Sequence, residues 1–135
     1  MRDFRKLSVW RKAHAAALLV YHETSRFPAV ERYALTAQVR RSAVSVAANI
    51  AEGCGRGSDP DRARFFQMAA GSASELEYQL LLARDLGLVT DDVFQRLSGE
   101  AVSIRRMLSG LLRAMKNGGG RRAKRPKRRR RPRPS

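Results

Sequence analysis

The sequence predicts an all-α fold, an antiparallel up-down-up-down four-helix bundle followed by a disordered basic C-terminal tail. Apolar residues recur at three- and four-residue spacing along four long segments, which is the periodicity of an amphipathic helix. No segment shows the alternation that is typical of a strand, and the short connections favour antiparallel neighbours. The composition then changes abruptly. We therefore divide the chain into a bundle, residues 1–117, and a tail, residues 118–135.

The first two helices are predicted over Trp10 to Thr24 and from about Val30 to Cys54. Pro28 ends the first, because proline disfavours helical geometry in the residue before it. Glu31 suits the positive end of the second helix. Three glycines from Gly53 onward should end that helix, since a C-cap often needs the left-handed conformation that glycine adopts readily. The predicted core positions are Val9, Ala13, Ala16, Ala17, Val20, Thr24, Leu35, Val39, Ser42, Ala43, Val46, Ala47, Asn49, Ile50 and Gly53.

The third helix should begin where Ser58 or Asp59 caps it and Pro60 occupies its first turn. Gly87 should end it. The fourth helix is predicted from Thr90 to Asn117, where three further glycines follow. The predicted core positions of these two helices are Phe65, Met68, Ala69, Ser72, Leu76, Leu80, Ala83, Val93, Leu97, Ala101, Ile104, Leu108, Leu111 and Met115.

Charge also divides the chain into two parts. The 28 basic and 12 acidic residues give a net charge of +16, of which residues 1–117 carry only +6. From residue 118 onward there is no acidic residue and no apolar side chain larger than Ala123, so this segment is predicted to be disordered when free. Its ten basic residues are Arg121, Arg122, Lys124, Arg125, Lys127, Arg128, Arg129, Arg130, Arg131 and Arg133.

This density of positive charge predicts contact with the phosphate backbone of RNA or DNA, because neutralised phosphates release their counterions. The tail has no aromatic residue, so we expect it to add affinity and little base recognition. A solubilising tail without a partner is the alternative. We expect no membrane partner, because the tail lacks apolar anchors. The aromatic residues of the bundle are too scattered to predict a base-stacking platform and are expected in the core or an interface: Trp10, Tyr33, Phe65, Phe66 and Tyr78.

A polar stripe at spacings of 4-4-3-4 shares one face of the predicted second helix: Arg41, Ser45, Asn49, Glu52 and Arg56. One interpretation is a structural network that fixes helix register, with partners on the third helix among Ser72, Glu75 and Glu77. The other interpretation is a partner surface, for a neighbouring subunit or for phosphates as secondary nucleic-acid contacts, through Arg40, Arg41 and Arg56.

No catalytic, metal or cofactor site is predicted. His14 and His22 lie two turns apart on one face, and the chain has neither a Glu-x-x-His pair nor a Gly-x-x-x-x-Gly-Lys motif. The single cysteine, Cys54, excludes an internal disulfide and suits a reducing cytoplasm. We find no secretion signal and no apolar run near the ~20 residues that cross a bilayer. We therefore expect a cytoplasmic protein that is not an enzyme.

Several segments are distinctive in order and spacing: Phe4-Arg5-Lys6-Leu7-Ser8-Val9-Trp10, Phe27-Pro28, Glu31-Arg32-Tyr33-Ala34-Leu35, Gln38-Val39-Arg40-Arg41-Ser42-Ala43-Val44-Ser45, Asn49-Ile50-Ala51-Glu52-Gly53, Arg56, Phe65, Ala69-Ala70-Gly71-Ser72 and Glu75-Leu76-Glu77. Over residues 4 to 115 they resemble the bacterial four-helix-bundle proteins encoded within intervening sequences of 23S ribosomal RNA genes. The resemblance implies a ring-shaped homopentamer with a nucleic-acid role and no established catalysis. More remotely, the chain is similar to the accessory variability protein of diversity-generating retroelements, a pentameric basic bundle that works with RNA and a reverse transcriptase.

Two functions are compatible with these observations. The first is a non-catalytic, oligomeric bundle that binds RNA or DNA mainly through phosphate-backbone electrostatics, with the tail as the main contact. The second is a homo-oligomeric protein–protein adaptor that recruits a partner such as a polymerase, in which the tail only adds solubility or electrostatic steering. Binding to a nucleic acid without any partner protein would distinguish the first from the second.

Overall fold

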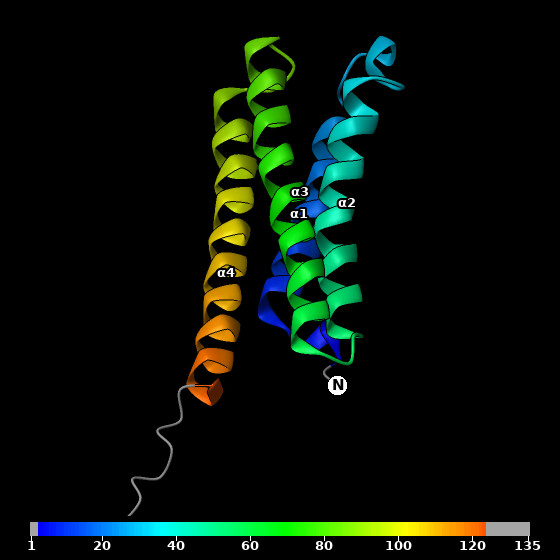
Figure 1. The fold of residues 1–135 in the computed structure, drawn as a ribbon. Helices are drawn as coiled ribbons and strands as arrows, with labels where there is room; N and C mark the ends of the chain where they lie inside the picture. The colour runs from blue at the N-terminus through cyan, green and yellow to red at the C-terminus, as the bar shows by residue number, and fades with distance from the viewer. Residues whose placement is uncertain (1–2, 124–135) are drawn as a thin grey trace, which may run out of the picture.

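The computed structural model describes residues 3–123 and contains four long helices (Figure 1). Two short 3-10 turns accompany them. The elements in chain order are η1 Phe4–Lys6, α1 Ser8–Thr24, η2 Ala29–Glu31, α2 Leu35–Cys54, α3 Asp59–Asp85 and α4 Asp91–Ala123. The described part of the chain has no strand. Within it, no helix combines the length and the apolar character that a membrane crossing requires.

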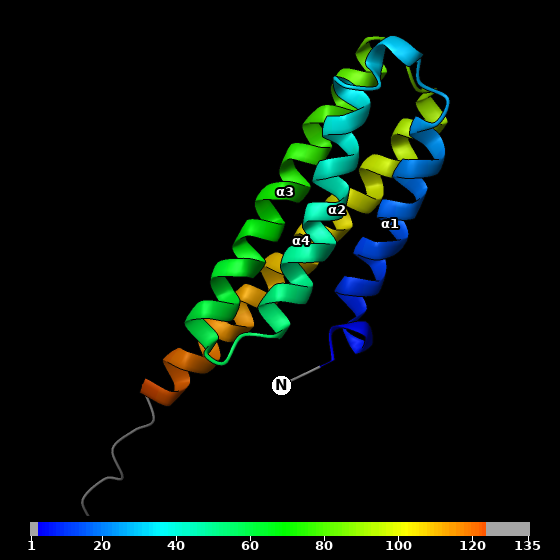
Figure 2. The same ribbon diagram turned by 90° about the vertical axis from the view of Figure 1, so that its right-hand side faces the viewer.

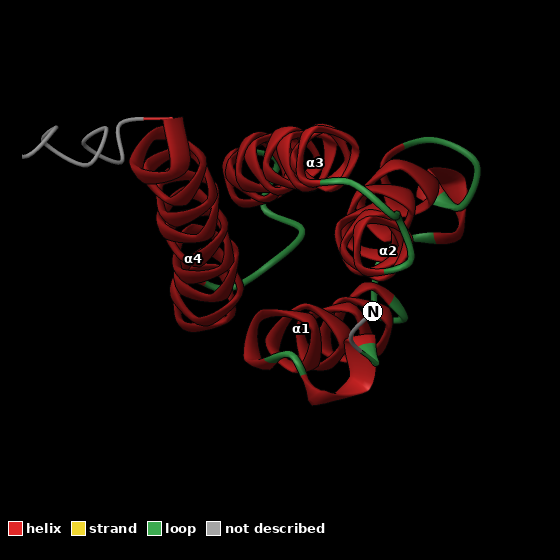
Figure 3. Ribbon diagram, turned by 60° about the horizontal axis from the view of Figure 1, so that its bottom comes forward, coloured by secondary structure: helices red, strands yellow, loops and turns green. Residues whose placement is uncertain are grey.

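Consecutive helices run in opposite directions, so the bundle is antiparallel with up-down-up-down topology (Figures 1 and 2). Each helix packs against its neighbours in the chain, and α4 closes the bundle against α1. Viewed towards one end, the four helices surround a common centre (Figure 3). The fold class that the helical periodicity predicts is therefore confirmed.

The core fills the centre of the bundle in two connected stretches along its length. Ile50, Ile104 and Leu108 are fully buried in the half that holds η1, and Val39 and Leu80 in the half that holds η2. Alanines stand between these larger residues, which lets the helix axes approach closely. These buried alanines are Ala13, Ala16, Ala17, Ala43, Ala47, Ala69, Ala73, Ala83 and Ala101. Every core position predicted on α1 is buried, and so are all those predicted on α2 except the half-buried Asn49.

The predicted core face of α3 is wrong at three positions, Phe65, Met68 and the half-buried Ser72. Phe65 is half-buried and Met68 is 48% exposed, whereas Phe66 is buried in the core. Ala69, one turn beyond Phe65, is buried as predicted. Both Phe65 and Phe66 are apolar and adjacent, so the sequence pattern alone does not decide which of them points inward. The contact of Phe66 with Gly53 of α2 places it inside.

Helix α2 begins at Leu35, five residues later than predicted. The chain first makes the 3-10 turn η2, and Ala34 then has φ −115° and ψ −107°, which interrupts helical geometry. Glu31 still lies at the start of α2, where its Oε2 accepts a hydrogen bond of 3.4 Å from the backbone N–H of Leu35. The carboxylate therefore satisfies one of the N–H groups that a helix start leaves free.

The glycines at the end of α2 do not adopt the left-handed conformation that the sequence predicts. Gly53 lies within the helix, and Gly55, the C-cap residue, has φ −82°. Among the described residues, only Gly87, after α3, has positive φ, at 73°. Gly53 is instead required for space, because a Cβ there would lie 2.7 Å from Cε1 of Phe66. The start of α3 follows the prediction, with Ser58 as N-cap and Pro60 in the first turn.

Helix α4 continues to Ala123, six residues beyond its predicted end at Asn117. Glycine lowers helix stability by about 1 kcal/mol relative to alanine and does not forbid a helix, so the three glycines after Asn117 are compatible with one. Residues 118–123, which the sequence assigns to a disordered tail, are therefore part of α4. The remainder of that predicted tail, residues 124–135, lies outside the described residues.

Candidate nucleic-acid interface

The middle of the polar stripe on α2 is a hydrogen-bonded cluster that joins α2 to α3. The hydroxyl oxygens of Ser45 and Ser72 are 2.8 Å apart. Asn49 donates from Nδ2 to the Ser45 hydroxyl at 3.0 Å and to the Ser45 carbonyl at 2.9 Å. These three side chains are half-buried, so their mutual hydrogen bonds offset the loss of contact with water. These hydrogen bonds form a structural contact that fixes the register of α2 against α3.

The C-terminal part of the stripe is a separate ion-pair cluster around Arg56. Its Nη2 lies 2.5 Å from Glu52 and its Nε lies 3.8 Å from Asp61 of α3. The guanidinium also covers the ring of Phe65, with the carbon Cζ 4.5 Å from the ring centroid. Two carboxylates therefore compensate this positive charge. Arg56 is poorly available to an external phosphate.

Arg41 and Glu75 take no part in either cluster. Both are exposed, and within residues 3–123 neither makes a side-chain hydrogen bond or ion pair. Glu77 faces α4 instead, where it accepts a hydrogen bond of 2.6 Å from Nε of Arg105. This hydrogen bond, together with the negative charge of the carboxylate, raises the pKa of Arg105 above its ordinary value. The predicted network is thus divided among three separate contacts.

The three bundle arginines that we predicted as secondary phosphate contacts do not form one patch. Arg40 and Arg41 lie in the second turn of α2, and Arg56 lies beyond the other end of that helix. The thirteen residue steps from Arg41 to Cys54 span about 20 Å at 1.5 Å per step. A surface that contains Arg40 and Arg41 must therefore be completed by other residues.

An open groove between the C-terminal half of α1, η2 and the first turns of α2 contains those other residues. Its polar and aromatic lining comes from Tyr21, Arg32, Tyr33, Thr36, Arg40, Arg41 and Ser45. This end of the bundle carries the turn between α1 and α2, drawn in pale blue in Figures 1 and 2. The groove gathers three guanidinium groups and two tyrosine rings on one surface.

Arg40 is held in place across this groove. Its Nε donates to the hydroxyl of Thr24 at 2.9 Å, and its Nη2 donates to the carbonyl oxygen of Tyr21 at 3.4 Å. Its guanidinium carbon lies 4.6 Å from the centroid of the Tyr21 ring. Arginine has five N–H donors, so three remain for a ligand. No carboxylate in the described part of the chain forms an ion pair with Arg40.

Sequence reasoning identified Arg40 and Arg41 but missed the tyrosines and Arg32. We expected Tyr33 and Tyr78 in the core or an interface. Both lie outside the core, at 90% and 62% exposure, and their place in an interface stays a prediction. Tyr33 follows η2 and precedes the helix, so it does not belong to the apolar stripe of α2. Its place between Arg32 and the Arg40-Arg41 pair was the signal that could have identified it.

The predicted tail is described only at its beginning. Arg121 and Arg122 belong to the last turn of α4, whose backbone the structure places at the end of the bundle opposite the groove (Figure 1). The other eight basic residues of the predicted contact lie outside the described residues: Lys124, Arg125, Lys127, Arg128, Arg129, Arg130, Arg131 and Arg133.

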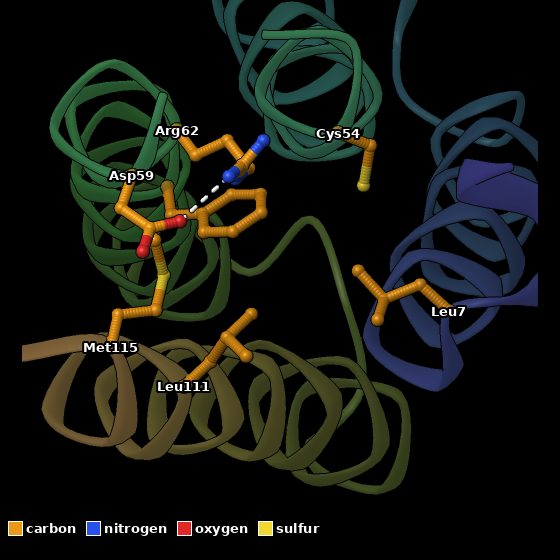
Figure 4. Close-up of a pocket in the computed structure, with 7 residues that line it drawn as sticks. Leu7, Cys54, Asp59, Arg62, Leu111 and Met115 are labelled. Atoms are coloured by element: carbon orange, nitrogen blue, oxygen red, sulfur yellow. Dashed lines mark hydrogen bonds and ion pairs between the residues drawn. The ribbon is translucent and has the colours of Figure 1, made fainter. Parts of the chain in front are cut away.

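A second concavity, of about 380 Å³, opens at the end of the bundle near η1 (Figure 4). Its lining is largely apolar and includes Leu7, Leu111, Met115 and the buried Cys54. The charged groups at its edge already have partners, because Arg62 donates to Asp59 at 2.6 Å and to the Arg56 carbonyl at 2.6 Å. The described residues contain no group of His, Cys, Asp and Glu side chains that could hold a metal ion. His14 stacks on Trp10 with ring centroids 4.9 Å apart.

Comparison with known proteins adds a family. The family model of the 23S rRNA-intervening sequence protein matches residues 5–110. The structure is similar to the crystal structure of a protein of unknown function from the S23 ribosomal protein family of Bacteroides thetaiotaomicron. That similarity has a TM-score of 0.71 at 23% identity and covers 77% of this chain and 97% of the other. The comparison with curated proteins gave no match. The family match covers most of the helical bundle described above, and the chain therefore belongs to the 23S rRNA-intervening sequence protein family.

Proposed function

We propose that the protein is a non-catalytic, oligomeric four-helix bundle that binds RNA or DNA mainly through the phosphate backbone. The observation that carries this proposal is the charge distribution. Ten of the 28 basic residues lie between positions 121 and 133, where there is no acidic residue. The phosphate backbone of a nucleic acid carries the dense negative charge that complements this segment. Release of its condensed counterions makes the contact favourable at moderate salt.

Ion pairing within the bundle supports a proposal in which the basic segment binds the nucleic acid and the bundle serves as its scaffold. Eight of the twelve acidic residues form ion pairs with basic residues of the bundle. Much of the positive charge of residues 1–117 is therefore compensated locally. The charge from residue 121 onward has no acidic residue near it in sequence. Phosphate binding should consequently depend more on this segment than on the sides of the bundle.

A protein–protein adaptor remains the second candidate, and one observation favours it. Several large apolar side chains are exposed on the outer faces of α1, α2 and α3. They are Leu18, Val44, Met68, Tyr78 and Leu81, with exposures between 38% and 62%. Exposed apolar groups of this kind are covered in interfaces between subunits or with partners. Self-association is compatible with both candidate functions.

Fluorescence anisotropy across a salt series tests the proposal. The full chain, a chain ending at Asn117 and a full-length variant with the ten basic residues replaced by glutamine would be titrated into labelled RNA and DNA. If about five basic residues contact phosphates, log K should fall with log salt at a slope of roughly −3.5 to −4.5. That slope is a loss of roughly 100- to 500-fold between 50 and 200 mM salt.

The two altered proteins should bind weakly and keep their helical circular dichroism, because the core of α4 is complete by Met115. The glutamine variant separates loss of charge from loss of chain length. Absence of binding by the full chain at low salt would contradict the proposal and favour the adaptor. A weak salt dependence would exclude phosphate contacts as the source of affinity.

A further inference from the structure

We propose that the groove between α1, η2 and the start of α2 binds unpaired nucleotides of a single-stranded nucleic acid. In this proposal a base stacks on the ring of Tyr33, and the adjoining phosphates contact Arg32, Arg40 and Arg41. The inference rests on the proposed function and deepens it, because it adds a site that discriminates single strands from duplexes. The tail alone is expected to bind both.

The first support is the exposure of Tyr33, which is 90% exposed in the connection between η2 and α2. Aromatic rings on which bases stack are a recurrent device of single-strand binders, because every base has a π-face. In a duplex both faces of each base are already stacked, so this ring could not be used. Tyr21, 47% exposed, lies in the same groove as a second ring.

The second support is the fixed position of Arg40. It is held by the Thr24 hydroxyl and the Tyr21 carbonyl, and it covers the Tyr21 ring at 4.6 Å. A planar guanidinium with three unused N–H donors is well suited to a phosphate, which accepts two parallel hydrogen bonds. Because Arg40 is already ordered, little side-chain entropy is lost when a phosphate binds.

The third support is that the charge of the groove is not compensated. In residues 3–123, none of Arg32, Arg40 and Arg41 forms an ion pair. Glu31 is the acidic residue beside them in sequence, and its Oε2 accepts from the Leu35 N–H at the helix start. By contrast, the charge of Arg56 is compensated, because two carboxylates lie near its guanidinium.

The fourth support is the side-chain hydroxyl of Thr36, which has no hydrogen-bond partner in the described chain. Thr36 lines the groove and is only 6% exposed. Buried polar atoms are nearly always satisfied, so an orphaned hydroxyl here is compatible with a site completed by ligand or by the water that accompanies it.

The test uses the full chain and three substitutions, Tyr33→Ala, Tyr33→Phe and, as a matched control, Tyr78→Ala. Tyr78 is another exposed tyrosine, on α3 and outside the groove. The probes are 20-nucleotide single strands of uridine and of deoxythymidine, an abasic DNA strand of the same length, and a blunt 20-base-pair duplex, all long enough to reach the groove and the end of α4 together. Sedimentation velocity of each variant records its assembly.

Tyr33→Ala should weaken binding to both base-containing strands about 5- to 150-fold, as expected for loss of one stacked base. Binding to the abasic strand and the duplex should change by less than about twofold, because neither offers an unpaired base. Tyr33→Phe keeps the ring and should bind as the parent does, as should Tyr78→Ala. A difference between uridine and deoxythymidine strands would assign the site to RNA or DNA.

An equal loss on all four probes, or no loss on any, would overturn the stacking site. Loss of assembly in Tyr33→Ala, together with an equal loss on all probes, would assign the groove to a second copy of the chain and also overturn it. Failure of the proposed function is distinguishable, because the parent protein would then bind none of the probes.

Discussion

At the scale of single residues, Gly53 is the most constrained of the described glycines, where α2 and α3 approach each other. A Cβ added there would lie 2.7 Å from Cε1 and 2.9 Å from Cδ1 of the buried Phe66, and 3.2 Å from Cβ of Phe65. Two adjacent side chains therefore occupy the space that any other residue would need. Phe66 is in the core and has little freedom to move.

Gly53→Ala should lower the free energy of unfolding by about 1–3 kcal/mol, because the new methyl group forces Phe66 from its packed position. Gly71→Ala is the matched control. It lies in the interior of α3, where an added Cβ would meet no neighbouring side chain within 4 Å, so alanine should stabilise by about 0.5–1 kcal/mol. Urea denaturation followed by circular dichroism measures both. A stabilised Gly53→Ala protein would show that the contact relaxes without cost.

The roles of these residues could be predicted only in part from the sequence. The glycines after Asn49 indicated the end of α2, but the space requirement of Gly53 depends on a helix that begins six residues later. The groove shows the same limit. Arg40 and Tyr21 are separated by nineteen residues and become neighbours only when the turn between α1 and α2 brings the helices together. Periodicity describes one helix at a time and cannot supply such contacts.

At the scale of the elements, ion pairs join α4 to α1, which is distant in sequence but adjacent in the bundle. Glu23 of α1 pairs with Arg96 of α4 at 3.0 Å, and Lys12 pairs with Glu100 at 3.0 Å. The two pairs differ in exposure. The Glu23 side chain is only 8% exposed, whereas the side chains of Lys12 and Glu100 are about one-third exposed. Loss of a partner should therefore matter more at Glu23.

Arg96→Ala should lower the free energy of unfolding by about 1–2 kcal/mol, because it leaves a buried carboxylate without its counterion. This loss of stability is smaller than for a fully buried ion pair, because the Arg96 side chain is 58% exposed. Arg106→Ala, on the same helix and without an ion pair among the described residues, should change stability by less than about 0.5 kcal/mol.

The double variant Glu23→Gln, Arg96→Ala should recover part of the loss, because a neutral amide is less costly to bury than an unpaired charge. Thermal unfolding of the four proteins provides the comparison. Equal stability of Arg96→Ala and Arg106→Ala would show that the pair contributes nothing. No recovery in the double variant would show that Arg96 acts through packing.

Element type was predictable from the sequence and element ends were less so. The four amphipathic stripes predicted the helices because burial of an apolar face stabilises each of them in the bundle. The start of α2 differs because the 3-10 turn η2 and the backbone of Ala34 interrupt the helix, and neither leaves a pattern in the sequence. The end of α4 differs because a glycine can lie inside a helix as well as at its end.

At the scale of the whole molecule, the groove and the last turn of α4 lie at opposite ends of the bundle. The groove is beside η2, and the last turn of α4, which contains Arg121 and Arg122, lies at the end of the bundle away from η2 (Figure 2). Helix α4 runs between these ends, and its 33 residues span about 50 Å. A nucleic acid that reaches both the groove and the last turn of α4 on one bundle must cover that distance. One that is shorter can occupy either contact but not the two together.

Affinity should therefore rise in a step as a single strand becomes long enough to reach both contacts. At about 3.4 Å per stacked nucleotide the step is expected near roughly 15 nucleotides. Beyond it the second contact forms at a high effective concentration, so affinity should increase at least about tenfold without any new kind of interaction. Anisotropy titrations with strands of 6 to 24 nucleotides at fixed salt would locate the step.

Tyr33→Ala and the glutamine variant of the basic segment should each remove the step, because each removes one of the two contacts. A smooth rise with length in the parent protein, in proportion to the number of phosphates, would mean that the two ends bind independently. A step that persists in Tyr33→Ala would place the second contact elsewhere on the bundle. The length dependence thus measures the geometry of the bound complex, because the length of α4, about 50 Å, sets the separation that the strand must match.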